Sequence, residues 1–162
     1  MTEFKHLSTL SRGSILGMLE RFYAAYSYPA DGELEAEWRR DWQSYDRLVF
    51  DNLGTVGGAG FASYEDGTLV GFCSWDPRGG LNKVLVGHNG ILPESRGRGY
   101  GSSQIAHMTE LLRERGFTKA FVATGAEAFF APARKMYEGR GFHEIERFAK
   151  SGQRLVRYEK TL

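Results

Sequence analysis

The sequence predicts an α/β fold with a mixed central sheet, and three observations lead to that prediction. Near the N-terminus, apolar side chains recur about every 3.6 residues in two separate stripes, as in amphipathic helices. Strand-like runs then alternate with helical runs to the end of the chain. The 162 residues, 41% hydrophobic and 25% charged, suit one compact domain. We therefore expect a single domain over residues 1–162, with about six or seven strands and about four helices.

The N-terminal region, residues 1–50, is expected to be helical. Residues 28–32 contain Pro29 and Gly32 and break the periodicity between two helices. A glycine-rich connection over residues 52–60 follows the second helix. The two apolar stripes consist of Ile15, Leu19, Phe22 and Tyr26, and of Leu34, Trp38, Trp42, Tyr45 and Leu48.

Strands are expected next. Residues 60–65 and 68–75 flank Asp66-Gly67, a strong signal for a two-residue hairpin turn. A third strand is expected over residues 83–92, and its internal glycines are typical of a bulge or of close approach by another backbone. The later elements are a helix that stops at Gly116, a strand over 119–124, a helix opened by Pro132, and a hairpin of strands 142–148 and 154–159 turning at Ser151-Gly152.

The most informative segment lies between the third strand and the next helix. Residues 96–101 read Arg-Gly-Arg-Gly-Tyr-Gly, and Ser102 follows. Glycines let the backbone turn sharply and let an anion approach the N–H groups. The first turn of the next helix leaves N–H donors unpaired, and the helix dipole adds positive potential there. We therefore expect a pyrophosphate cradle, to which Arg96 and Arg98 add charge-assisted hydrogen bonds.

Other phosphate-binding loops do not match this segment. The P-loop requires Gly-Lys-Ser/Thr, a tripeptide that the chain lacks. The dinucleotide fingerprint, counted from Gly97, requires a third glycine where Ser102 stands. A protein-kinase loop would need a catalytic lobe after it, and too little chain remains.

The loop instead resembles the signature of the GNAT superfamily of N-acetyltransferases, Arg/Gln-x-x-Gly-x-Gly/Ala between a strand and a helix. Residues 96–101 satisfy every fixed position, and Ile91-x-Pro93 precedes them. Downstream, residues 133–142 resemble the family's Ala-x-x-x-Tyr-x-x-x-Gly-Phe segment. Two motifs in this order are more specific than either alone. The clear resemblance covers residues 83–148, and the N-terminal half agrees in the order of its elements.

The resemblance implies a fold in which two parallel strands splay apart and acetyl-coenzyme A lies in the gap. It also implies an acceptor that is a small-molecule or peptide amine, with residues 1–50 on the acceptor side. Phe130 stands where the family often has an asparagine that helps to hold the cofactor. The cofactor-binding residues that it implies are Ile91, Leu92, Arg96, Gly97, Arg98, Gly99, Tyr100, Gly101, Ser102, Phe130 and Ala133.

The chemistry implied is direct attack of a neutral amine on the thioester, which requires a proton acceptor. The oxyanion requires fixed N–H donors, and the resemblance nominates the backbone of Ile91 and Leu92. Tyr137 matches the family's general-acid tyrosine, although its helical periodicity alone would place it in the core. The base stays open between His88, Glu127 and a water relay, and His88 is preferred for its intrinsic pKa.

Composition argues against several other classes of protein. The net charge of +1 gives no overall field for nucleic acid or a membrane surface. No apolar run approaches the length of a membrane span. Cys73 is the only cysteine, which suits a reducing compartment, and no apolar signal core opens the chain, so we expect a cytoplasmic protein. His6, His107 and His143 show no metal-ligand spacing with Cys73, so we expect no metal. A monomer or a homodimer is expected.

Alternatives remain at this point. A non-catalytic domain that binds or senses acyl-coenzyme A would keep the loop without needing Tyr137. An Arg/Gly-type RNA-binding protein would use the loop differently, but such segments usually repeat in disordered tails. Acidic residues within 31–37 could attract a cationic amine, although a helix start favours carboxylates in any case. Trp38 and Trp42, one helical turn apart, are typical of a core and less typical of an acceptor pocket.

Overall fold

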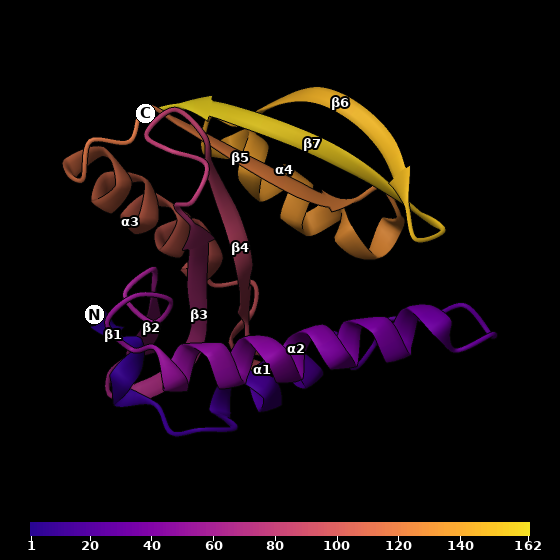
Figure 1. Cartoon of the computed structure of the whole chain (residues 1–162), viewed down its shortest axis with the longest axis horizontal. Helices are drawn as coiled ribbons and strands as arrows, with labels where there is room; N and C mark the ends of the chain where they lie inside the picture. The colour runs from indigo at the N-terminus through magenta and orange to yellow at the C-terminus, as the bar shows by residue number, and fades with distance from the viewer. The chain divides into compact units, whose positions relative to one another are not determined.

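The computed structural model describes residues 1–162 and contains seven strands, four α-helices and three short 3-10 helices. The strands are β1 (Thr2–His6), β2 (Gly60–Glu65), β3 (Thr68–Asp76), β4 (Val84–Ile91), β5 (Lys119–Gly125), β6 (His143–Lys150) and β7 (Gln153–Thr161). The helices are α1 (Ser14–Phe22), α2 (Glu33–Asp51), α3 (Tyr100–Glu114) and α4 (Ala131–Gly139), with η1 (Leu7–Thr9), η2 (Pro93–Ser95) and η3 (Ala128–Phe130). The strands form one mixed sheet in the order β1-β2-β3-β4-β5-β7-β6 (Figure 1), which confirms the predicted fold class.

The fold divides into two compact units. The first contains residues 1–73 and 89–100, and the second contains residues 74–88 and 101–162. The chain passes from one unit to the other within β3, within β4 and at the start of α3.

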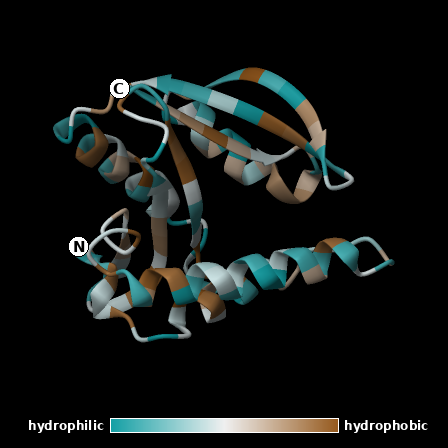
Figure 2. Cartoon of the chain, in the orientation of Figure 1, coloured by the Kyte–Doolittle hydropathy of each residue, from teal (hydrophilic) through white to brown (hydrophobic).

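The core of the first unit lies between the two N-terminal helices and the strands of that unit. The Phe22 ring of α1 stacks on the Phe72 ring of β3, with 5.7 Å between ring centroids. Figure 2 shows hydrophobic and hydrophilic bands alternating along α2, as an amphipathic helix requires. The buried members of this core are Leu7, Ile15, Met18, Leu19, Phe22, Trp42, Val49, Ala62, Phe72 and Leu92.

The expectation of helix from the first residue was wrong. Residues 2–6 form β1, which pairs antiparallel with β2, and Phe4 stands opposite Ser63. The Phe4 ring packs edge-on against Phe61, with 5.1 Å between centroids. A segment this short carries no readable periodicity, and its hydrogen bonds come from a partner strand far along the chain.

The buried stripe of α2 also differs from the expected one. Leu48 is 50% exposed, whereas Val49 is fully buried and Asp46 is only 5% exposed. The Asp46 carboxylate accepts hydrogen bonds from the main-chain N–H groups of Gly13 and Leu16 at 3.0–3.1 Å. These amides belong to the start of α1, where they have no partner within the helix. Asp46 therefore caps α1 from the neighbouring helix.

The first helix is shorter than expected. It ends at Phe22, so Tyr26 lies beyond it, although Tyr26 remains buried and stacks on Trp38 at 5.3 Å. Trp38 packs among aromatic neighbours of the same core, which supports the core interpretation of this residue.

The predicted turns are confirmed. Asp66-Gly67 and Ser151-Gly152 each have two consecutive positive φ angles, as a tight hairpin turn requires. Gly116, with φ of +87°, follows the last turn of α3, where the sequence indicated a helix stop.

In the second unit, β5, β7 and β6 form an antiparallel ladder. Ile105, Met108 and Leu112 of α3 are fully buried.

Candidate functional site

Residues 96–100 of the predicted anion loop lie in the first unit, directly after β4 and η2. Gly97 and Gly99 have φ angles of +77° and +83°, and a Cβ on either would meet nothing within 4 Å. Backbone conformation alone therefore requires glycine at these two positions. The N–H groups of residues 97–99 donate to no main-chain acceptor, and α3 begins at Tyr100. Consecutive unpaired amides beside a helix start form a concave anion-binding nest.

The two arginines of the loop have different surroundings. Arg98 is exposed, and no hydrogen bond or ion pair holds its guanidinium. Arg96 donates from Nε to the carbonyl oxygen of Ile91 at 3.0 Å and from Nη2 to that of Phe22 at 2.9 Å. Of the two arginines expected to bind phosphate, Arg98 has its whole guanidinium unbonded, whereas Arg96 has two N–H groups engaged with main-chain carbonyls, and binding of an anion by either stays a prediction.

The end of β4 leads into this loop, and both nominated oxyanion donors are buried there. The N–H of Leu92 already donates to the carbonyl oxygen of Val70 at 2.8 Å. The nomination of Leu92 as a donor is therefore corrected, because its proton is used within the sheet. The nomination of Ile91 stays a prediction.

In the second unit, β4 and β5 are parallel neighbours that pair over a short length. The register contains two pairs, Val84 with Ala120 and Leu85 with Phe121. This short ladder agrees with the splay expected of two parallel strands. His88 lies in β4 beyond the paired part, and its side chain is partly exposed. Its carbonyl oxygen accepts a hydrogen bond from Ser74 Oγ at 2.7 Å.

Tyr137 lies on the buried face of α4 and is 4% exposed. Its ring meets Phe142 edge-on at 5.7 Å and lies 6.4 Å from the Tyr158 ring. Tyr158 donates its hydroxyl proton to Glu138 Oε1 at 3.0 Å. Burial, together with this hydrogen bond, raises the pKa of Tyr158 to about 12. Tyr137 is thus part of an aromatic cluster, and its role as an acid stays a prediction.

The segment after β5 holds the other nominated residues of the second unit. Glu127 is exposed and precedes η3, and Ala133 is partly exposed on α4. Phe130 is buried with its ring against Gly125, where an added Cβ would lie 2.1 Å from the ring. Arg134 donates from Nη1 to the carbonyl oxygens of Gly125 at 2.6 Å and Glu127 at 2.8 Å. This arginine fixes the chain where β5 ends.

Sequence reasoning missed three polar residues that organise these segments, namely Asp46, Arg134 and Arg140. Arg140 donates from Nε to Ser102 Oγ at 2.5 Å, on the first turn of α3. A carboxylate at a buried stripe position was a usable signal for Asp46. No sequence signal identifies the carbonyl oxygens that Arg134 contacts.

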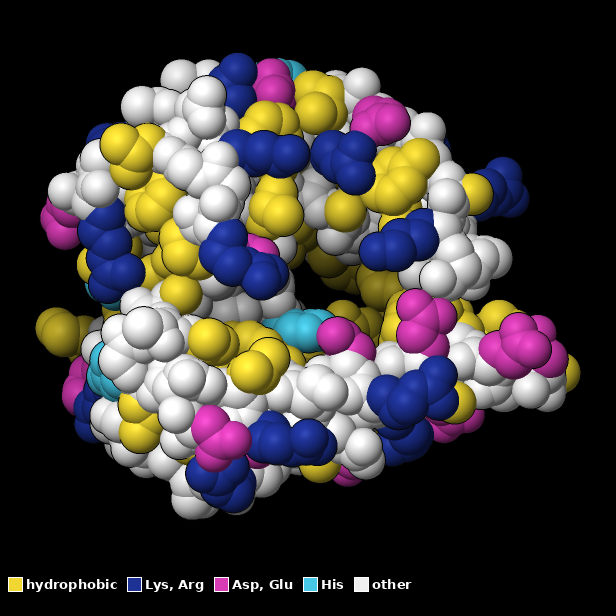
Figure 3. All heavy atoms as spheres, in the orientation of Figure 1, with side chains coloured by type: hydrophobic (Ala, Val, Ile, Leu, Met, Phe, Trp, Pro, Cys, Tyr) yellow, Lys and Arg dark blue, Asp and Glu magenta, His cyan; other side chains and the backbone are white.

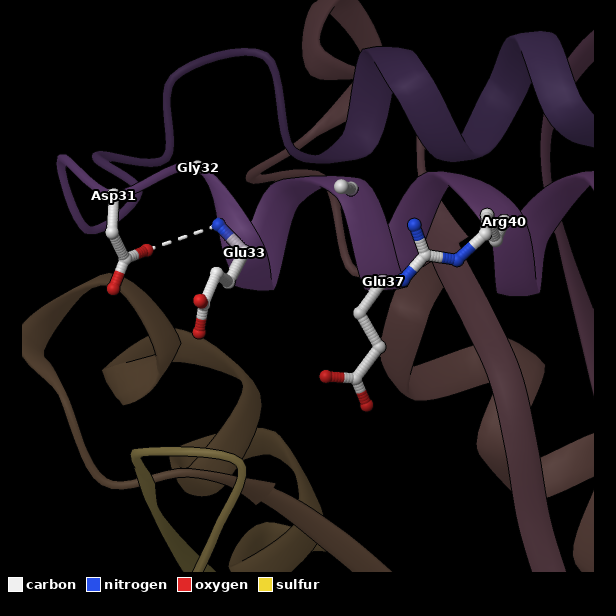
Figure 4. A pocket seen from close by; sticks show the side chains of 6 residues that line it. Asp31, Gly32, Glu33, Glu37 and Arg40 are labelled. Carbon is white, nitrogen blue, oxygen red and sulfur yellow. Dashed lines mark hydrogen bonds between the residues drawn. The ribbon is translucent and has the colours of Figure 1, made fainter.

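A shallow depression lies along the first turns of α2 (Figure 4), with a volume of about 480 Å³. Asp31 Oδ1 accepts a hydrogen bond from the N–H of Glu33 at 3.0 Å. This bond supports the interpretation that the acidic residues within 31–37 stabilise the start of α2. Figure 3 shows acidic side chains gathered at this end of α2. The residues that line the depression are Asp31, Gly32, Glu33, Ala36, Glu37 and Arg40.

The structure lacks two kinds of feature. No three or more His, Cys, Asp or Glu side chains are grouped so as to hold a metal ion. None of the helices has both the length and the apolar character needed to cross a membrane.

Comparison with known sequences gives two matches. The model of the acetyltransferase (GNAT) family matches residues 18–142, which is most of the chain. A curated relative, the uncharacterized N-acetyltransferase YsnE of Bacillus subtilis strain 168, is 38% identical over 56 residues. That alignment covers 35% of this chain and 37% of the relative.

Many solved structures share this fold, and three of them are acetyltransferases that align with almost the whole chain. A putative GNAT-family acetyltransferase of Desulfovibrio desulfuricans has a TM-score of 0.74 and 18% identity, with 99% of both chains covered. The PaiA N-acetyltransferase of Thermoplasma acidophilum, solved with coenzyme A, has a TM-score of 0.70 and 16% identity, covering 100% of this chain and 99% of that one. The ribosomal-protein-S18-alanine N-acetyltransferase of Escherichia coli has a TM-score of 0.66 and 15% identity, covering 99% and 94%.

Proposed function

The chain belongs to the acetyltransferase (GNAT) family, and from that premise we propose that it transfers an acetyl group from acetyl-coenzyme A to a primary amine. The neutral amine attacks the thioester carbon, and the tetrahedral intermediate expels the thiolate of coenzyme A. The amine loses one proton to a base, and the thiolate gains one from an acid. The products are an amide and free coenzyme A.

The observation that carries this proposal is the nest of unpaired amides at residues 97–99, next to the start of α3. These amides suit the diphosphate of coenzyme A, because main-chain donors and a helix N-terminus both favour bound anions. Arg98 adds an exposed positive charge at the same loop. The PaiA enzyme, solved with coenzyme A, shares this fold and supports the choice of donor.

The proposal also assigns an acid and a base, and both come from the second unit. Tyr137 is proposed as the acid that protonates the leaving thiolate. His88 is preferred as the base because it lies beyond the residues of β4 that pair with β5. Its side chain is also partly exposed. Glu127 and a water relay remain the other two routes for the proton.

The acceptor is proposed as a small-molecule or peptide amine. Among proteins of this fold, one is described as acting on ribosomal protein S18 and another is the NatC complex bound to a Gag peptide. We also propose a cytoplasmic location, because Cys73 is a buried free thiol, and a monomer or homodimer.

One observation favours a second function. Tyr137 is packed between two aromatic rings, as a core residue would be. A domain that binds acyl-coenzyme A without transferring the acyl group would need the loop but not a reactive tyrosine.

The test combines calorimetric binding of coenzyme A with an assay of coenzyme A release over a panel of polyamines, amino acids, aminoglycosides and peptides. Binding together with amine-dependent release supports the enzyme. Binding with no release for any amine supports the binding domain. Absence of binding refutes both.

A further inference from the structure

Arg96 belongs to the loop by sequence, but its guanidinium contacts the main chain on either side of it. One carbonyl, that of Ile91, is at the end of β4, and the other, that of Phe22, ends α1. The two bonds measure 3.0 and 2.9 Å, within the normal range for a charged donor. Phe22 is 74 positions away in the sequence, so this side chain links two distant segments of the first unit.

The junction that Arg96 spans is tightly packed beneath it. A Cβ on Gly90 would lie 2.5 Å from the Phe22 ring, and a Cβ on Gly71 would lie 2.1 Å from the carbonyl oxygen of Gly90. The last turn of α1, the end of β4 and β3 therefore meet without spare room. A shift of α1 would therefore press on the end of β4, from which the chain continues through η2 into the loop.

A second link joins the same segments at the surface. Arg21 of α1 and Glu94 of η2 form an ion pair at 2.5 Å, with more than half of each side chain exposed. An exposed pair of this kind contributes little to stability. Arg96, in contrast, satisfies two carbonyl oxygens with a planar fork of donors, which a lysine ammonium cannot reproduce.

We propose that Arg96 is a positioning residue that holds the last turn of α1 to the end of β4 and so sets the conformation of the loop, and that it does not bind the diphosphate itself. The consequence for catalysis rests on the proposed function. The link is a property of the free protein and can be tested without any ligand.

The first experiment measures amide hydrogen exchange in the free protein. Arg96→Gln should accelerate exchange at Tyr23 and Leu92 about tenfold, because charge-assisted bonds to two carbonyls are lost. Arg96→Lys should behave like Arg96→Gln, since it keeps the charge but not the fork. Arg21→Gln, which removes the exposed ion pair between the same segments, is the matched control and should leave these rates unchanged. Unchanged exchange in Arg96→Gln would overturn the link.

The second experiment compares two acetyl donors, acetyl-coenzyme A and S-acetylpantetheine, which lacks the diphosphate. Arg96→Gln should lower kcat/KM for both donors by the same factor, about tenfold, because the end of β4 is disturbed for either. Arg98→Gln should lower it for acetyl-coenzyme A only. A loss confined to acetyl-coenzyme A in Arg96→Gln, or recovery in Arg96→Lys, would identify Arg96 as a diphosphate ligand and overturn the proposal.

The two experiments fail in distinguishable ways. If the wild-type protein acetylates no amine with either donor, the proposed enzymatic function fails. The exchange experiment still decides whether Arg96 links α1 to β4.

Discussion

Replacing Gly99 with alanine tests whether the amides of the loop bind the diphosphate. The φ angle of Gly99 is +83°, and an added Cβ would meet no atom within 4 Å. The substitution therefore introduces no clash, and its cost is the left-handed conformation alone, about 1–2 kcal/mol for an L-residue. We expect the free loop to relax to a negative φ and turn its amides away from their present direction.

Binding of coenzyme A must then restore the strained conformation. The same 1–2 kcal/mol is subtracted from the binding free energy, which raises the Kd by about 5- to 30-fold. Calorimetry with coenzyme A measures this change directly, and chemical denaturation of the free variant measures the change in unfolding free energy, expected to stay below about 1 kcal/mol because the loop relaxes.

Gly54→Ala is the matched control. A Cβ added at Gly54 would also meet open space, but Gly54 has no positive φ angle. It should bind coenzyme A like the wild type. Wild-type affinity in Gly99→Ala would refute the amide nest as the diphosphate site, and equal losses in both variants would assign the effect to general destabilisation.

Three further predictions concern stability, turnover and pH. Asp46→Ala removes the carboxylate that caps α1, so denaturation should show a loss of about 2–4 kcal/mol, whereas the exposed Asp51→Ala should change little. Tyr137→Phe should lower the rate of acetyl transfer more than coenzyme A affinity, and equal rates would return Tyr137 to a packing role. Folded Tyr158 keeps its proton up to about pH 12, against 10 for an ordinary tyrosine, so unfolding free energy should fall as pH rises from 10 to 12. Denaturation across that range should show a smaller fall in Tyr158→Phe; the same fall would contradict the raised pKa.

Elements with a local signal could be predicted from the sequence. The strand over residues 60–65 matches β2 residue for residue, because the Asp66-Gly67 turn fixes where it ends. The glycines of the loop were recognisable because alternating positive φ angles leave few other residue types.

What the sequence could not show depends on partners far along the chain. β1 is a strand because it pairs with β2 at the edge of the sheet, with Thr2 opposite Glu65. Arg96 has the residue type of a phosphate ligand, yet two of its N–H groups donate to the carbonyl oxygens of Phe22 and Ile91. An arginine side chain can donate to a carbonyl oxygen or to a phosphate oxygen. Which of the two it contacts depends on the folded structure and is not encoded in the residue type.

The way the chain alternates between the two compact units limits how the protein can be dissected. Residues 89–100, which carry the loop, belong with the N-terminal residues 1–73, while residues 74–88 belong with the C-terminal part. No single cut of the polypeptide separates the units, because a fragment ending at residue 73 or 88 lacks residues 89–100 of the first unit. Halves expressed separately should fail to fold, whereas circular permutants opened at exposed turns such as Ser151-Gly152 would keep both units whole.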